Sequence, residues 1–237
     1  MTSLRRRGVT ASRRVTGLPP VTGPTMSTVE PDGSSTSSSV VVPAPSGIVS
    51  GNLLLAFVRL ADNTWLNEGD VTAPTGWTLL RIDSDNPSSS FRSHQGVYVK
   101  TAGSSEPATY TWDRGSTSYW AVDLHNIPDH AGVDVHGGNG DGGFDVSTLE
   151  LPSVTATGDG TLYAAWSAWR GGRSGKWGDA PSGMTELWNA PEEATADVMA
   201  AMTAKEAVPS GATGTRTASR VEGDVDRLCG SVVVVAS

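Results

Sequence analysis

The sequence contains very little cysteine and histidine, with one Cys and four His among 237 residues. A single cysteine excludes an internal disulfide, and so few histidines exclude a zinc site built from a Cys/His framework. Cys229 stands shortly before the apolar run Val232–Val235. We therefore expect a buried structural thiol at this position and not a nucleophile.

Long apolar segments are also missing. No stretch approaches the roughly 18 apolar residues that a membrane-spanning helix needs, so no transmembrane helix and no membrane insertion are expected. The N-terminus carries Arg5, Arg6 and Arg7, but no apolar segment follows these residues. That pattern does not fit a secretory signal peptide.

Charge is divided unevenly along the chain. Five of the 17 basic residues lie in the first 14 positions, which contain no acidic residue: Arg5, Arg6, Arg7, Arg13 and Arg14. The rest of the chain has 12 basic and 25 acidic residues, a difference of −13. A basic arm of this kind binds nucleic acid, stays disordered or threads into an acidic neighbouring subunit. The acidic body offers no basic face for a phosphate backbone, so we expect no nucleic-acid binding by the body.

The composition predicts an arm followed by an all-β domain. Residues 1–39 are rich in Arg, Pro and Ser, and we expect an extended N-terminal arm and linker that needs a partner to become ordered. Residues 40–237 are predicted to form one β-sandwich domain, because 28 Gly and 14 Pro favour short strands joined by turns. Its halves are expected at about 40–136 and 148–237, connected by the glycine-rich segment 132–145.

Three short patterns occur twice in the same order, at offsets of 109, 107 and 102 residues. The matched pairs are Gly51–Phe57 with Gly160–Trp166, Ala73–Leu80 with Ala180–Leu187, and Thr101–Ala102 with Thr203–Ala204. Such a repeat indicates that one ancestral β unit has been doubled. We therefore predict a jelly-roll-like antiparallel β-sandwich built from two similar halves.

One segment is ambiguous in the sequence. Val198–Glu206 has the composition of a helix, yet the repeat aligns it with the predicted strand Val97–Thr101. We predict a strand, because tertiary context overrides propensity in short segments. A second predicted strand, Ser118–Ile127, alternates apolar and polar residues and is expected to be half-buried, with Asp123 and His125 on its polar face.

The tryptophans suggest a contact surface. Trp65 lies in one predicted loop, and the equivalent loop of the second half contains Trp169, Arg170, Arg173, Lys176 and Trp177. A loop Trp beside an Arg or Asp can stack on a sugar ring while its polar neighbours bind hydroxyls. The same residues can instead cap the open ends of the sandwich or pack against a neighbouring subunit. The other five are predicted to lie in or near the core: Trp77, Trp112, Trp120, Trp166 and Trp188.

Enzymatic and metal-binding motifs are weakly represented. The sequence contains no Gly-x-Ser-x-Gly elbow, His-Glu-x-x-His pair or phosphate-binding loop, so we predict no enzyme and no catalytic residues. Asn139, Asp141, Asp145 and Glu150 fall at spacings of a calcium loop, but Phe144 stands where that loop needs glycine. We predict no cofactor, with calcium at these four residues as the alternative.

Several phrases of the sequence resemble a family of β-sandwich domains in bacteriophage virion proteins, especially minor tail proteins, which also occur as modules of bacterial surface proteins. The phrases that carry the resemblance are Gly51–Ala56, Pro74–Leu80, Tyr98–Pro107, Pro181–Trp188 and Gly211–Ala218. The resemblance covers about residues 40–237. It implies a β-sandwich fold and a structural role, and it carries over no catalytic residue.

We therefore expect a structural phage protein in the virion, most simply a minor tail protein. It would be assembled in the host cytoplasm and released by lysis. Its arm would bind other virion proteins, its body would be displayed as a homo-oligomer, and its loops could touch a glycan of the host surface. Two alternatives remain: a capsid decoration protein of the same fold, and a carbohydrate-binding module or enzyme that uses the Trp65 and Trp177 loops.

Overall fold

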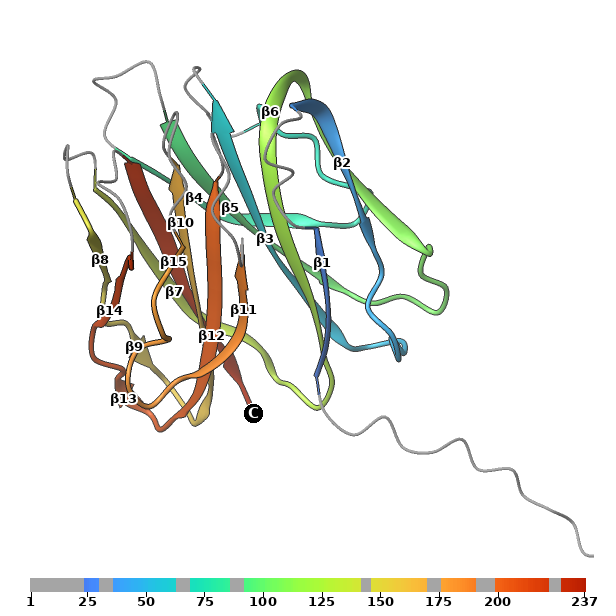
Figure 1. Ribbon diagram of the computed structural model, residues 1–237. Helices are drawn as coiled ribbons and strands as arrows, with labels where there is room; N and C mark the ends of the chain where they lie inside the picture. Colours follow the sequence, from blue (N-terminus) through green and yellow to red (C-terminus); the bar gives the residue numbers. More distant parts are fainter. Residues whose placement is uncertain are drawn as a thin grey trace, which may run out of the picture.

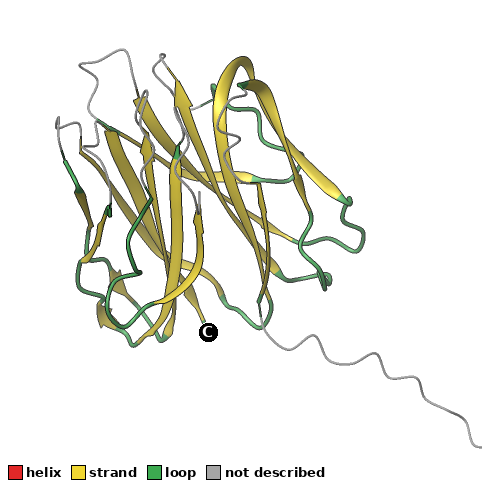
Figure 2. Cartoon of the chain, in the orientation of Figure 1, coloured by secondary structure: helices red, strands yellow, loops and turns green. Residues whose placement is uncertain are grey.

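The structure is a computed structural model, and it is described here for residues 24–29, 36–62, 69–85, 92–141, 146–169, 176–190, 199–221 and 227–237. These residues form strands and connecting turns and contain no helix, which confirms the predicted all-β class (Figure 2). Within the same residues, no helix is therefore long and apolar enough to cross a membrane.

The first half of the chain forms a six-stranded antiparallel sheet with the order β1-β6-β3-β5-β4, and β2 pairs with β6 off this path. Its strands are β1 (Thr25–Val29), β2 (Ser37–Pro43), β3 (Leu53–Asp62), β4 (Thr78–Ser84), β5 (Arg92–Thr101) and β6 (Thr109–Ile127). β6 has 19 residues, so its first part pairs with β2 and its last part with β3 and β1.

The second half forms a five-stranded sheet with the order β11-β12-β10-β15-β7, together with two small two-stranded sheets. Its large sheet contains β7 (Gly132–Asp141), β10 (Gly160–Trp169), β11 (Thr185–Ala190), β12 (Ala200–Val208) and β15 (Arg227–Ala236). The small sheets pair β8 (Thr148–Leu151) with β14 (Arg216–Ser219), and β9 (Thr155–Ala156) with β13 (Gly211–Ala212).

The two large sheets lie face to face, and each is also covered on its outer side (Figure 1). On the outer side of the first sheet, β2 and the first part of β6 cover a core that includes Trp77 and Trp112. On the outer side of the second sheet, β8, β9 and β14 cover a core that includes Trp166 and Trp177. We call the buried interface between the facing surfaces of the two large sheets the seam.

The two large sheets share one order of strands. The sequence β4-β5-β3-β6 in the first sheet corresponds to β11-β12-β10-β15 in the second. The repeated Pro-x-Gly turns are also equivalent, because Gly76 and Gly183 both have positive φ. In each turn the residue after the glycine donates its backbone N–H to the proline carbonyl. The ambiguous segment forms β12, which confirms the predicted strand.

The register of the ladders corrects the alignment of the repeat. In the first sheet Val99 of β5 pairs with Thr78 of β4 on one side and with Leu55 of β3 on the other. In the second sheet Lys205 of β12 pairs in the same way with Thr185 of β11 and Tyr163 of β10. β3 and β10 are thus offset by 108 residues, not 109, and β5 and β12 by 106, not 102. A slip of one residue turns every side chain to the opposite face of the sheet. The sequence phrases matched because leucine and alanine occupy both faces of these strands.

A shared irregularity supports the corrected register. β4 and β11 each contain one bulged residue against their partner strand, between Leu79 and Arg81 and between Glu186 and Trp188. The bulged residues, Leu80 and Leu187, both pack against the apolar cluster of the seam. A bulge changes the direction in which a side chain points. The bulge in each half therefore directs a leucine toward the other sheet.

Two predicted connections are strands in the structure. The segment 132–145 was expected to connect the halves, but Gly132–Asp141 forms β7 and pairs with β15, so the halves divide between β6 and β7. Within the predicted linker, Thr25–Val29 forms β1 and pairs with β6, and the predicted domain boundary at residue 40 lies inside β2. Both segments gain backbone hydrogen bonds from a neighbouring strand, which a reading of local composition cannot anticipate.

Candidate functional site

The seam has apolar ends and a polar middle. At one end Leu55 and Phe57 of the first sheet pack against Tyr163 and Val233 of the second. At the other end a separate cluster contains Trp169 and Trp188. Between these clusters lies the polar band, a set of buried side chains that are each at most 6% exposed: Arg59, Asp83, Ser93, Gln95, Asp123, His125, Ser167, Thr203 and Ser231.

Arg59 of β3 joins the two sheets. Its guanidinium forms a short ion pair with Asp123 of β6, and Arg59 Nη2 donates to Thr203 Oγ1 of β12 at 2.6 Å and to the Met202 carbonyl at 3.2 Å. Asp123 Oδ2 lies 2.6 Å from His125 Nε2. Both members of the ion pair are fully buried. Because both charges have lost their hydration, the pair depends on the hydrogen bonds that compensate for that loss.

The surroundings of Asp123 keep it ionised. Burial alone would raise the pKa of this carboxyl, but the charge of Arg59 and the hydrogen bond with His125 outweigh burial and hold the pKa below its ordinary value. An Arg inside an otherwise apolar strand such as Leu53–Ala61 was the sequence signal for a buried acidic partner. The prediction of half-buried strands was wrong for Asp123 and His125, because the second sheet covers the face on which they lie.

A second group in the polar band is centred on Ser231 of β15. Its Oγ donates to Asp83 Oδ2 of β4 at 2.5 Å and accepts from Gln95 Nε2 of β5 at 2.8 Å. Arg81 also binds Asp83, with Arg81 Nε 2.6 Å from Asp83 Oδ2. Gly138 of β7 makes room for this carboxylate, because a Cβ at that position would lie 2.2 Å from Asp83 Oδ2.

Cys229 belongs to the same buried region. It is fully buried, as the sequence predicted, and its Sγ lies 3.4 Å from Ser93 Oγ, which in turn lies 2.9 Å from Ser167 Oγ. Burial raises the pKa of the Cys229 thiol, so the reactive thiolate is disfavoured. These contacts fit a structural thiol that packs between the sheets.

The predicted tryptophan site is only partly within the described residues. Trp65, Arg170 and Arg173 lie outside them. Trp169 is 4% exposed and Trp177 is 1% exposed, so neither indole offers a face for a sugar, and the expectation of glycan contact is corrected for both. Trp177 packs in the outer core of the second sheet under Arg220, whereas Lys176 is exposed. Both indoles pack in apolar clusters, Trp169 at one end of the seam and Trp177 in the outer core of the second sheet. The five tryptophans predicted for the core are all buried, which confirms that prediction.

The other predicted site residues are dispersed. Arg5, Arg6, Arg7, Arg13 and Arg14 lie outside the described residues, as do Asp145 and the side chain of Asp141. Asn139 Nδ2 donates to the backbone carbonyl of Glu150 at 3.0 Å, which joins β7 to β8. No group of three or more His, Cys, Asp or Glu side chains in the described ranges is placed to hold a metal ion.

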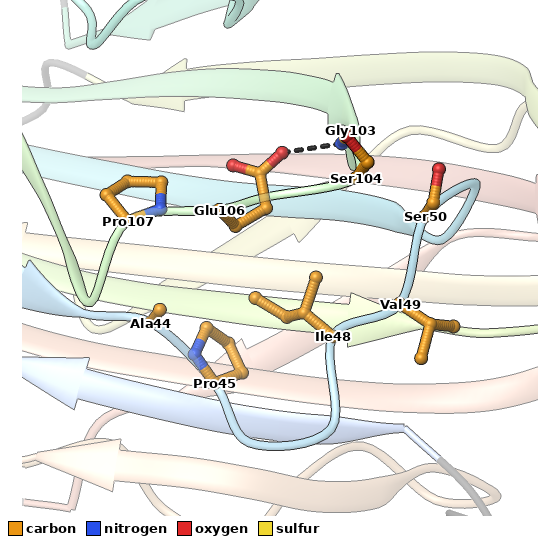
Figure 3. A pocket seen from close by; sticks show the side chains of 9 residues that line it. All are labelled: Ala44, Pro45, Ile48, Val49, Ser50, Gly103, Ser104, Glu106 and Pro107. Carbon is orange, nitrogen blue, oxygen red and sulfur yellow. Dashed lines mark hydrogen bonds between the residues drawn. The ribbon is translucent and has the colours of Figure 1, made fainter.

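One hollow opens on the surface beside the first sheet. It has a volume of about 470 Å³ and lies between the β2–β3 loop, with Pro45, Ile48 and Val49, and the β5–β6 loop, with Glu106 and Pro107 (Figure 3). The Glu106 carboxylate is already bound, by the Lys100 ammonium at 2.7 Å, the Gly103 N–H at 2.6 Å and the Tyr110 hydroxyl at 2.7 Å. The carboxylate therefore orders the wall of the hollow through these three bonds.

Glu106 should make stability depend on pH. Burial raises its pKa, but hydrogen bonds from Lys100, Gly103 and Tyr110 outweigh burial, so the pKa lies below the ordinary value of 4.5. A carboxyl with a lowered folded-state pKa stabilises the fold above its unfolded-state pKa, and this contribution is lost as the pH falls through the folded-state pKa. The difference in unfolding free energy between the wild type and Glu106→Gln should therefore shrink between about pH 6 and pH 3. Urea unfolding at several pH values measures it, and a constant difference would contradict this assignment.

Comparisons of the chain with protein-family models, with curated proteins and with solved structures give no match.

Proposed function

We propose that this chain is a structural, non-enzymatic protein of a bacteriophage virion, most simply a minor tail protein. Its N-terminal arm fixes it to other virion proteins, and its jelly-roll-like body is displayed as a homo-oligomer at the particle surface. The division of charge is the observation that carries the proposal, since five arginines precede a body with an excess of 13 acidic residues. A basic arm of this kind can thread into an acidic neighbouring subunit.

The position of β1 in the fold supports this role. β1, the first described strand, is the edge strand of the first sheet and pairs with β6. A segment that enters at a sheet edge can reach a neighbouring subunit without disturbing the core. The doubly covered sheets suit a protein that must stay folded on a particle outside the cell. The sequence phrases that resemble phage virion domains lie within this body, from Gly51 onward.

Deletion of residues 2–16 tests the anchoring role. The shortened chain should remain soluble and folded, because the deleted residues precede β1, but it should no longer be incorporated into particles. Co-sedimentation of the tagged chain with purified particles measures incorporation, and thermal unfolding of the free chain checks the fold. Incorporation at the wild-type level would remove the anchoring role.

Two matched variants test whether incorporation requires the positive charge of the arm or the arginine side chains themselves. Replacing Arg5, Arg6, Arg7, Arg13 and Arg14 with Lys keeps the charge and should preserve incorporation, whereas replacing all five with Gln should abolish it. A gold label on the C-terminal Ser237, viewed by negative-stain microscopy, distinguishes the tail from the head. A label over the head would favour the alternative of a capsid decoration protein.

The lectin or carbohydrate-active enzyme is the third candidate. With Trp169 and Trp177 buried, it now rests on Trp65, Arg170, Arg173 and Lys176. Retention of the chain on a column of host cell-wall glycan, with loss of retention in Trp65→Ala, would support a lectin. Release of sugar from that glycan would make the protein an enzyme.

A further inference from the structure

Ser231, Gln95 and Asp83 meet in the polar band with the geometry of a nucleophile, an acyl group and a base. The Ser231 hydroxyl donates to Asp83 at 2.5 Å, so its proton already points at a carboxylate. The Gln95 side-chain amide lies on the other side of the same hydroxyl, with its nitrogen 2.8 Å away. Ser231 and Gln95 are fully buried, and Asp83 is 6% exposed.

The orientation of the Gln95 amide is defined by a third contact. Its Nε2 also donates to the Ala165 carbonyl of β10 at 3.3 Å, and a carbonyl accepts only from the nitrogen side of an amide. Gln95 Oε1 is buried and has no hydrogen-bond partner among the described residues. A buried amide oxygen without a partner is unusual in a folded protein. Because this oxygen is bound to nothing, the amide can turn its carbonyl carbon toward Ser231 without breaking a hydrogen bond to the oxygen.

We propose that Ser231 and Gln95 form an intramolecular ester, which links β15 of the second sheet covalently to β5 of the first. Ser231 Oγ attacks Gln95 Cδ while Asp83 accepts the hydroxyl proton. The Cδ–Nε2 bond then breaks, Asp83 returns the proton to the leaving nitrogen, and ammonia departs. One C–O bond forms, one C–N bond and one O–H bond break, and one N–H bond forms. No oxidant, metal or other reactant takes part.

The distances are short enough for this reaction. Gln95 Cδ is one amide bond from Nε2, so it lies within about 4.1 Å of Ser231 Oγ. Attack needs roughly 3–3.5 Å, which a small rotation of the Gln95 side chain supplies. Arg81 holds the Asp83 carboxylate through both oxygens, so the base cannot turn away. Exclusion of water from the seam then protects the ester from hydrolysis.

Intact-mass spectrometry of the denatured full-length chain tests the proposal. The wild type should be lighter than its sequence by one ammonia, about 17 Da, and peptide mapping should find the segments around Gln95 and Ser231 in one linked product. Hydroxylamine, which cleaves esters, should separate them. A wild-type chain at the full sequence mass after prolonged incubation would overturn the proposal.

Matched variants identify the residues from which a loss of ammonia arises. Ser231→Ala removes the nucleophile and should restore the full mass, and Gln95→Glu, which keeps the size of the side chain but offers an unreactive carboxylate, should do the same. Ser167→Ala removes another fully buried serine of the polar band and should keep the deficit. A deficit that persists in Ser231→Ala would arise elsewhere and would overturn the proposal. Thermal unfolding of each variant checks that it folds, because a misfolded chain would lose the deficit whichever residue had been replaced.

Discussion

Replacing Arg59 with Leu should lower the free energy of unfolding by about 3–5 kcal/mol, because removal of one partner leaves a buried charge without compensation. Asp123 is fully buried, and its other hydrogen-bond contact is with His125. The loss would also remove the bonds from Arg59 to Thr203 and the Met202 carbonyl in the second sheet. Urea unfolding monitored by Trp fluorescence measures the change.

An ion pair nearer the surface provides the control for this variant. Arg216 and Glu206 form a short ion pair with side chains 16% and 14% exposed. Replacing Arg216 with Leu should cost about 1 kcal/mol or less, since more exposed pairs contribute little. The double variant Arg59→Leu, Asp123→Leu should recover part of the stability, because it leaves no unpaired charge. A cost for Arg59→Leu no larger than that for Arg216→Leu would contradict the role assigned to the pair.

Replacing Gly140 with Ala should destabilise the fold by roughly 1–3 kcal/mol or more, because an added Cβ must displace backbone. That Cβ would lie 1.9 Å from the Ser84 carbonyl oxygen at the end of β4. β4 and β7 are edge strands of different sheets, so this contact joins the two large sheets at one edge of the seam. Differential scanning calorimetry should show a lower unfolding temperature.

Gly158 provides the matched comparison. A Cβ at this position meets no atom within 4 Å, and its φ is not in the left-handed region. Gly158→Ala should therefore leave stability unchanged or raise it slightly, by restricting the unfolded chain. An equal effect of the two substitutions would show that the approach of β4 to β7 does not depend on glycine.

Most of the strands could be predicted because their signals are local. Apolar runs such as Leu53–Leu60 and the Pro-x-Gly turns at Gly76 and Gly183 carry their own periodicity and turn chemistry. The repeat even overruled the helical composition of the segment that forms β12. The alignment of β3 with β10 was wrong by one residue. Leucines and alanines lie on both faces of these strands, so the sequence does not show which face is turned toward the other sheet.

The seam could not be predicted because its partners are distant in sequence. Asp123 looks like a solvent-facing residue of an alternating strand until the second sheet covers it, and Arg59 alone does not reveal its partner. The glycines of β7 suggested a connection between the halves, whereas Gly138 and Gly140 allow close approach to Asp83 and Ser84. Trp177 looked like an exposed loop residue, yet it fills the outer core of the second sheet.

Amide hydrogen exchange in the intact chain tests most directly whether the two halves form one body joined by the seam. The central strands β3 and β5 of the first sheet and β10 and β15 of the second should exchange with the same free energy, equal to that of global unfolding. Arg59→Leu should lower all four values together. The account would be contradicted if each half exchanged with its own free energy and Arg59→Leu lowered only the value of the first half.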